Sequence, residues 1–156
     1  MKTLRYLLII LLSACLLPGC GDGEIIDEEG NGKEEEEEVV KDDKPAWNAP
    51  KVETFEYSMT YVTQISFEGK LTTNTATEIA AFLGEECRGK ATIKYEASLK
   101  LYLCYLTIVS NTVSGEKITL SVFDPDKSIL YKNATTIDFS NNQTLGSMDS
   151  ILECKK

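Results

Sequence analysis

The residue types that enzymes use most often are unevenly represented in this 156-residue chain. Histidine is absent, which excludes a Ser-His-Asp triad, a Cys-His pair and a histidine-ligated zinc site. Glu85 and Glu86 are adjacent carboxylates, but neighbours in a strand point to opposite faces and cannot act together as an acid–base pair. The sequence therefore predicts no catalytic residue and indicates a protein that is not an enzyme.

The stretch from Asp124 to Ser128 spaces two carboxylates in the way that ligands alternate in a calcium loop. An apolar run follows at once, and no bidentate glutamate stands in register. Pro125 followed by Asp126 is ordinary turn chemistry, so we expect a hairpin turn here. The sequence predicts no metal site and no cofactor.

Arg88 is the one arginine after Arg5. Its planar guanidinium can hold carboxylates or carbonyl groups in a way that a lysine cannot. Gly84 and Gly89 stand on either side of it and indicate a tight strand connection in which positive φ is needed. Arg88 either ties this hairpin to Glu86 or a neighbouring loop, or it grips a ligand carboxylate. The flanking glycines favour the tie.

Aromatic side chains are numerous enough to form a platform on which sugar rings stack. Strands also favour tyrosine simply because it packs well on a pleated surface. We expect most of these rings in the core or half-buried, and the platform is the alternative. The residues concerned are Trp47, Tyr95, Tyr102, Tyr105 and Tyr131.

Cys87, Cys104 and Cys154 follow the predicted linker. Export would place them in an oxidising compartment, where one disulfide is allowed and one thiol is left over. Cys104 shares its parity with the neighbouring apolar residues and is expected to point inward. A Cys87–Cys104 disulfide and buried free thiols stand as alternatives.

The elements that must position these residues are strands. Apolar residues alternate along 57–67, and a period of two indicates a half-buried strand. Short turn signals separate further β-rich runs at 78–83, 91–95, 99–110, 117–124, 129–132 and 135–139. Seven or eight short strands of this kind predict an all-β fold, a single antiparallel β-sandwich that is Ig-like or jelly-roll-like.

The N-terminus has the pattern of a secretory signal at residues 1–19, with Lys2 and Arg5 before an apolar run that is too short to span a bilayer. The run ends in Leu-Pro-Gly-Cys20, which resembles the bacterial lipobox and implies acylation of Cys20, with a chain such as palmitate. Cys15 ends a competing match, but cutting there would leave two leucines of the apolar run in the mature chain. We therefore expect Cys20 to be the lipid anchor.

Residues 20–46 are predicted to be a disordered acidic linker, because twelve acidic residues and three lysines between Gly21 and Lys44 leave little to bury. The β-sandwich domain is expected at 47–156. Most of the chain's net charge of -9 belongs to the linker. Such a charge argues against nucleic acid and anionic membrane surfaces as partners.

The run from Ala81 to Gly89 reads A-F-L-G-E-E-C-R-G and resembles a β-sandwich domain of the A-F-x-G-x-E-x-R-G type that recurs in surface lipoproteins of Bacteroidota. The acidic segment after Cys20 resembles their surface-export signal, and Asp149-Ser150-Ile151 resembles their O-glycosylation motif, which implies a glycan on Ser150. The resemblance implies a lipid-anchored protein of the bacterial outer membrane, exposed at the cell surface.

Two classes of function follow from these expectations. The first is a non-catalytic binding or adhesion module for a glycan, a peptide or a surface protein. The alternative is a structural subunit or spacer of a surface assembly, with no small ligand of its own. An exposed aromatic cluster would favour the first, and a long bare strand edge would favour strand addition to a partner.

Overall fold

The computed structural model describes residues 41–155; the predicted signal peptide, Cys20 and residues 21–40 of the linker lie outside the described residues. One 3₁₀ turn, η1 (Val52–Thr54), precedes the strands, and the all-β prediction is confirmed. Within the described part, no helix has the length and apolar character needed to cross a membrane. The strands are β1 (Tyr57–Phe67), β2 (Lys70–Leu71), β3 (Glu78–Leu83), β4 (Glu86–Glu96), β5 (Leu101–Ser110), β6 (Ser114–Asp124), β7 (Ile129–Ser140) and β8 (Thr144–Cys154).

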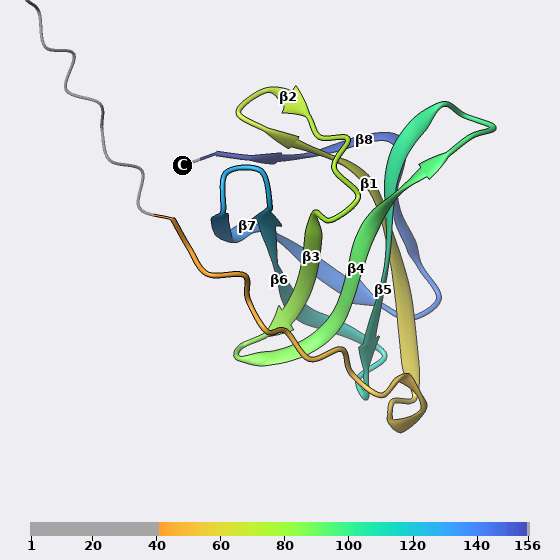
Figure 1. The fold of residues 1–156 in the computed structure, drawn as a ribbon. Coiled ribbons are helices and arrows are strands. Elements are labelled where there is room, and N and C mark those ends of the chain that lie inside the picture. Colours follow the sequence, from red (N-terminus) through yellow and green to blue (C-terminus); the bar gives the residue numbers. More distant parts are fainter. Residues whose placement is uncertain (1–40, 156) are drawn as a thin grey trace, which may run out of the picture. The chain divides into compact units, whose positions relative to one another are not determined.

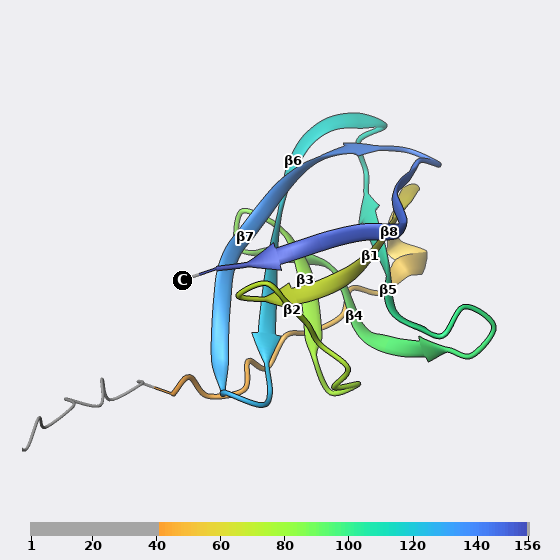
Figure 2. The same cartoon turned by 90° about the horizontal axis from the view of Figure 1, so that it is seen from above.

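The strands form one curled sheet in the order β2-β1-β5-β4-β3-β6-β7, and β8 pairs with β1. Strand β4 joins the two layers of the sandwich, because it pairs with β3 as far as Thr92 and with β5 from Ile93 onward. One layer thus contains β1, β2, β5 and β8, and the other contains β3, β6 and β7 (Figure 1). The curl is plain from above (Figure 2).

The core fills the space between the layers with the inward-facing residues of each strand. The period of two predicted for 57–67 is present, with Met59, Tyr61 and Ile65 in the core. Cys104 is fully buried, as its parity predicted. Each large apolar side chain removed from water contributes roughly 1.5–3 kcal/mol. The opposite layer supplies Ile79, Ala81, Ile118, Leu120, Val122 and Phe139.

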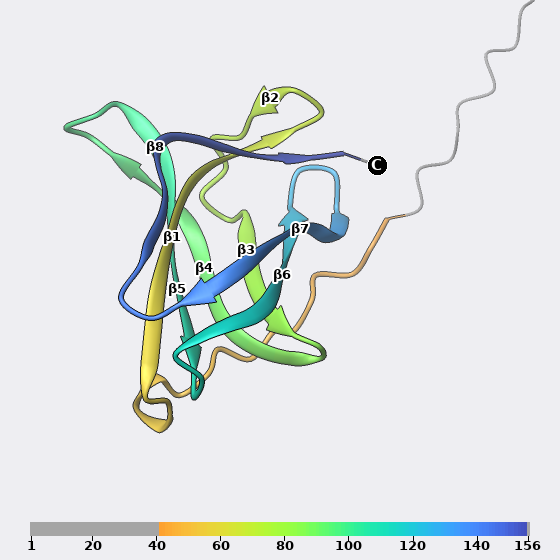
Figure 3. The same ribbon diagram turned by 180° about the vertical axis from the view of Figure 1, so that it is seen from behind.

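Strand β8 was not among the predicted strands, and its pairing with β1 is the one parallel pairing among the described strands. It runs beside β1, first with Thr60 opposite Thr144 and later with Phe67 opposite Cys154 (Figure 3). The register shifts between Val62 and Gln64, where β8 bulges outward over residues 147–150. Since most of β8 is exposed, its sequence has little hydrophobic alternation to reveal it.

The first described residues cross the domain as an extended stretch, which we call the N-terminal segment (residues 41–50). Its Asp42 N–H donates to the Ser128 carbonyl at 2.6 Å, and the Leu130 N–H donates to Asp42 Oδ2 at 2.8 Å. Lys44 forms an ion pair with Glu78 at 2.7 Å. The domain therefore begins before Trp47, and the predicted boundary of the linker at residue 46 is too late.

Candidate functional site

The outer face of β3 lies beneath the N-terminal segment. Ile79 and Ala81 point into the core, so Glu78, Ala80 and Phe82 point the other way. The N-terminal segment passes over this face (Figure 1), where Ala80 is completely buried and Glu78 is only 6% exposed. A face that would otherwise meet solvent is thus part of the domain interior.

Trp47 is the aromatic anchor of the N-terminal segment. Its ring packs edge-to-face on Phe82, with 6.0 Å between the centroids and 70° between the planes, an arrangement that aromatic pairs favour. The Lys90 ammonium donates to the Trp47 carbonyl at 3.5 Å, and the same ammonium lies 3.0 Å from Glu78 Oε2. Lys90 therefore holds the N-terminal segment and β3 together.

Two grooves meet at the Trp47–Phe82 pair. The larger has a volume of about 560 Å³ and runs between the N-terminal segment and the β3–β4 hairpin. The smaller, about 220 Å³, runs over β6 and β7. The larger groove is lined chiefly by Trp47, Asn48, Lys51, Phe55, Phe82, Glu86 and Cys87, and the smaller by Trp47, Phe82, Thr119, Ser121, Leu130, Lys132 and Asn133.

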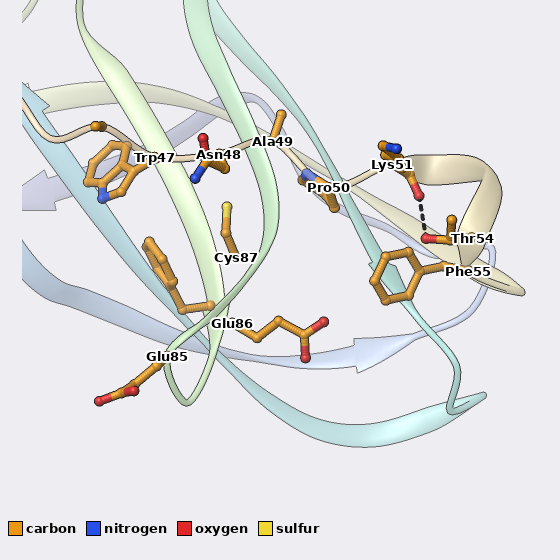
Figure 4. Close-up of a pocket in the computed structure, with 12 residues that line it drawn as sticks. Trp47, Asn48, Ala49, Pro50, Lys51, Thr54, Phe55, Glu85, Glu86 and Cys87 are labelled. Atoms are coloured by element: carbon orange, nitrogen blue, oxygen red, sulfur yellow. Dashed lines mark hydrogen bonds between the residues drawn. The ribbon is translucent and has the colours of Figure 1, made fainter.

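The larger groove combines aromatic rings with hydrogen-bonding groups (Figure 4). Trp47 and Asn48 lie across from Cys87, and Glu86 points along the groove toward Phe55 (Figure 4). Glu86 is exposed, so carboxylate lone pairs that face solvent can accept hydrogen bonds from ligand hydroxyl groups. Aromatic rings beside amide and carboxylate groups can bind a ligand that has both an apolar face and hydroxyl groups.

Arg88 lies behind this groove and does not line it. Its side chain is buried, with 8% exposed. The guanidinium lies 3.2 Å from the Glu86 carboxylate, which is the ion pair expected if Arg88 holds the hairpin to Glu86. A second nitrogen donates to the Val109 carbonyl at 3.3 Å and lies 3.8 Å from Glu116. The side chain thus connects β4 with β5 and β6, and its Nε has no hydrogen-bond partner in the described residues.

Three residues that the sequence does not mark as site residues complete the cluster around Arg88: Phe55, Ser110 and Glu116. The Phe55 ring lies 5.2 Å from the Arg88 guanidinium carbon, a cation–π contact. Glu116 accepts a hydrogen bond of 2.5 Å from Ser110 Oγ, and that serine is completely buried. No local signal marks Phe55, Ser110 or Glu116, because each stands more than twenty residues from Arg88 in the chain.

The glycines on either side of Arg88 have different roles. Gly84 has φ +60° at the β3–β4 turn, as expected. Gly89 lies inside β4 with no positive φ, so the expected turn at this position is wrong. A Cβ on Gly89 would lie 2.2 Å from the Thr107 carbonyl oxygen. Glycine is needed there because the backbones of β4 and β5 approach closely.

The cysteines at 87, 104 and 154 are free, and the proposed Cys87–Cys104 disulfide is wrong. Cys104 pairs with Ile93 in the β4–β5 ladder, and Cys87 is six residues away along β4, which is about 20 Å. A disulfide needs Cα atoms roughly 4.4–6.8 Å apart. Burial raises the pKa of Cys104 to about 12 and is the main cause that raises that of Cys154 to about 12. Burial also raises the pKa of Cys87.

The five aromatic residues considered for a platform do not gather in one place. Tyr131 is buried and stacks on Phe67 at 5.2 Å. Tyr95 and Tyr102 form a tilted pair at 5.0 Å on the β4–β5 hairpin. Tyr105 is 45% exposed on β5. Trp47 alone of the five lies at the two grooves.

The stretch from Asp124 to Ser128 and the side chain of Ser150 are the two remaining candidates. The Asp126 N–H donates to Asp124 Oδ1 at 2.9 Å, which is a turn closed by an aspartate side chain. In residues 41–155 no three Cys, Asp or Glu side chains converge to hold a metal ion. Ser150 is half-buried in the β8 bulge, and its Oγ accepts a hydrogen bond from the Ser147 N–H at 2.9 Å.

Comparison with protein-family models, with curated proteins and with solved structures finds no match for this chain.

Proposed function

We propose that this chain is a cell-envelope lipoprotein whose β-sandwich domain is a non-catalytic binding module for glycans. The observation that carries the proposal is the Trp47–Phe82 pair, which stands between two surface grooves. Aromatic faces bind the apolar C–H face of a sugar ring, and the surrounding amide, hydroxyl and carboxylate groups bind its hydroxyls. Because the grooves meet at Trp47, an oligosaccharide that fills both passes the indole.

The anchor is the second part of the proposal. Cys20 carries acyl chains that hold the protein in the bacterial outer membrane, on the cell surface. The lipobox-like end of the apolar run and the acidic residues after it support this placement. Mass spectrometry of the mature N-terminus tests it. An unmodified Cys20, or acyl chains on Cys15, would contradict the anchor without affecting the binding proposal.

A glycan array probed with the full-length chain tests the binding module. We expect the wild type to bind a set of oligosaccharides and Trp47→Ala to lose at least about tenfold in affinity for them, because the variant removes the stacking surface. Tyr95→Ala is the matched control, since it removes an aromatic ring that is 50% exposed and lines neither groove. The control should bind like the wild type.

Two results would overturn the proposal. The first is a wild type that binds no glycan on the array, which would favour the structural subunit or spacer of a surface assembly. The second is a Trp47→Ala variant that binds as well as the wild type while its melting temperature is unchanged. Thermal melts of each variant separate a lost ligand contact from a lost fold.

A further inference from the structure

A third groove lies where β4 passes from one layer of the sandwich to the other. It has a volume of about 310 Å³ and shares no lining residue with the two grooves at Trp47; it is lined by Lys90, Ala91, Thr92, Lys94 and Tyr105. It lies where β4 leaves β3 and begins to pair with β5, at Ile93. Cys104 and Leu106 point into the core, so Tyr105 between them points outward.

The lysines give this groove an excess of positive charge. No carboxylate of residues 41–155 forms an ion pair with Lys94, which is exposed. Lys90 lies 3.0 Å from Glu78, but that single carboxylate also pairs with Lys44 at 2.7 Å. Two ammonium groups thus share one negative charge, and Lys94 adds a third positive charge. Such a surface attracts an anion.

The remaining lining residues suit a ring with hydroxyl groups. Tyr105 is 45% exposed, which leaves its aromatic ring available for stacking. Thr92 places a hydroxyl group between the two lysines along β4. The volume is at the low end of the roughly 300–1,000 Å³ found for small-molecule sites, so the groove takes a ligand of about one ring rather than a long chain.

We propose that this groove binds an acidic sugar, with the carboxylate on the Lys94 ammonium and the ring face on Tyr105. Ammonium–carboxylate contacts are stronger than those between neutral groups, and the aromatic ring selects a ligand with an apolar face. The site does not depend on the glycan function proposed for the grooves at Trp47.

Titration of the full-length chain with glucuronate, followed by NMR, tests this inference, with glucose as the neutral probe of the same ring size. We expect glucuronate to shift the amide signals of Thr92, Lys94 and Tyr105 and to bind about tenfold more tightly than glucose. The preference should shrink as salt is added, because the groove is open to solvent. Equal affinity for the two sugars, or no binding of glucuronate, would overturn the inference.

Variants assign the site. Lys94→Gln and Tyr105→Ala should each weaken glucuronate binding by about five- to tenfold, and both side chains are exposed enough to be replaced without unfolding the domain. Lys100→Gln is the matched control, because it removes the same charge on the same hairpin outside the groove. Loss of binding in Lys100→Gln, or unchanged affinity in Lys94→Gln, would contradict the proposed site.

Discussion

Arg88 and Glu78 are buried charged side chains, and each is paired from more than one element. Glu78 of β3 meets Lys44 of the N-terminal segment and Lys90 of β4. Arg88 of β4 contacts Glu86 of its own strand and Glu116 of β6. Removing one member of such a pair leaves a buried charge without compensation, which costs more than the intact pair contributes. Glu78 therefore holds the N-terminal segment against β3 and β4, and Arg88 connects β4 with β5 and β6.

Replacing Arg88 by lysine should lower the free energy of unfolding by about 1 to 3 kcal/mol. A lysine keeps the positive charge, but its single ammonium cannot contact Glu86, Glu116, the Val109 carbonyl and the Phe55 ring together. Denaturant unfolding of the wild type and Arg88→Lys measures the difference.

Glu86→Gln is the control for this comparison. Glu86 has 59% of its side chain exposed, and Glu116 still compensates the Arg88 charge in this variant, so the loss of stability should be smaller than for Arg88→Lys. If the unfolding curve of Arg88→Lys were identical to that of the wild type, the structural role of Arg88 would be contradicted. The β3–β4 turn would then be the place to test for ligand binding.

The carboxylate of Glu78 makes stability depend on pH. Burial alone would raise its pKa, but the hydrogen bonds and charges of Lys44 and Lys90 outweigh burial and hold the pKa below its ordinary 4.5. The unfolded chain therefore takes up this proton at a higher pH than the folded one. The stabilisation is complete above about 4.5 and is lost as the pH falls through the lower folded value.

Comparison of the wild type with Glu78→Gln between pH 7 and pH 3 tests this dependence. We expect the variant to be less stable at neutral pH, and the difference in free energy of unfolding to narrow as the pH falls below 4.5. Glu85→Gln, at an exposed position, should stay close to the wild type at pH 7. If the difference in free energy of unfolding between the wild type and Glu78→Gln were the same from pH 7 to pH 3, the effect of Glu78 would not depend on its charge.

Among the elements, β4 is the strand that belongs to both layers. Its first half pairs with β3 and its second half with β5, and at Gly89 its backbone passes close to the Thr107 carbonyl. The distance leaves no room for a Cβ, because the obstructing atom is backbone and cannot rotate away. Only glycine therefore fits where β4 approaches β5 at this position.

Gly89→Ala should therefore lower the free energy of unfolding by about 2 to 4 kcal/mol, as overpacking at a fixed contact does. Gly84→Ala is the matched control, since it has open space around it and costs only the strain of φ +60°, about 1 to 2 kcal/mol. Urea unfolding of both variants gives the comparison. An equal loss at the two positions would mean that β4 and β5 can separate without cost.

In the whole domain, the last strand completes the layer that begins with β1. The pairing of β8 with β1 covers the edge of β1 that β5 does not occupy. Leu152 and Cys154 of β8 lie in the core, and burial of the leucine alone contributes roughly 1.5–3 kcal/mol. Domains of this size have only about 5–15 kcal/mol of net stability.

A chain that ends at residue 143 should therefore fail to fold cooperatively. Near-ultraviolet circular dichroism and a thermal melt would show the loss of fixed tertiary packing and of the unfolding transition. Removal of Lys155 and Lys156 alone is the control and should leave the melting temperature within a degree or two. A cooperative unfolding transition in the shorter chain would show that the rest of the domain folds without β8.

The class of fold, the strand at 57–67 and the inward position of Cys104 could be predicted from the sequence. The sequence also offers Glu86, two residues away, as one of the possible partners of Arg88, and the structure contains this ion pair. These features are local: a period of two decides which side chains share a face, and a turn signal decides where a strand ends. The acidic composition likewise predicted a linker, although its last residues, with Asp42 and Lys44, belong to the domain.

Tertiary structure alone decided which strands are neighbours. It placed β8 beside β1, Trp47 on Phe82 and Glu116 beside Arg88, and it separated Cys87 from Cys104. The candidate grooves at Trp47 arise from such contacts, so the sequence contained the indole but not its position. The physical reason is that alternation along a strand specifies the face of each residue and leaves the partner strand open, because pairing is set by the packing of the whole core.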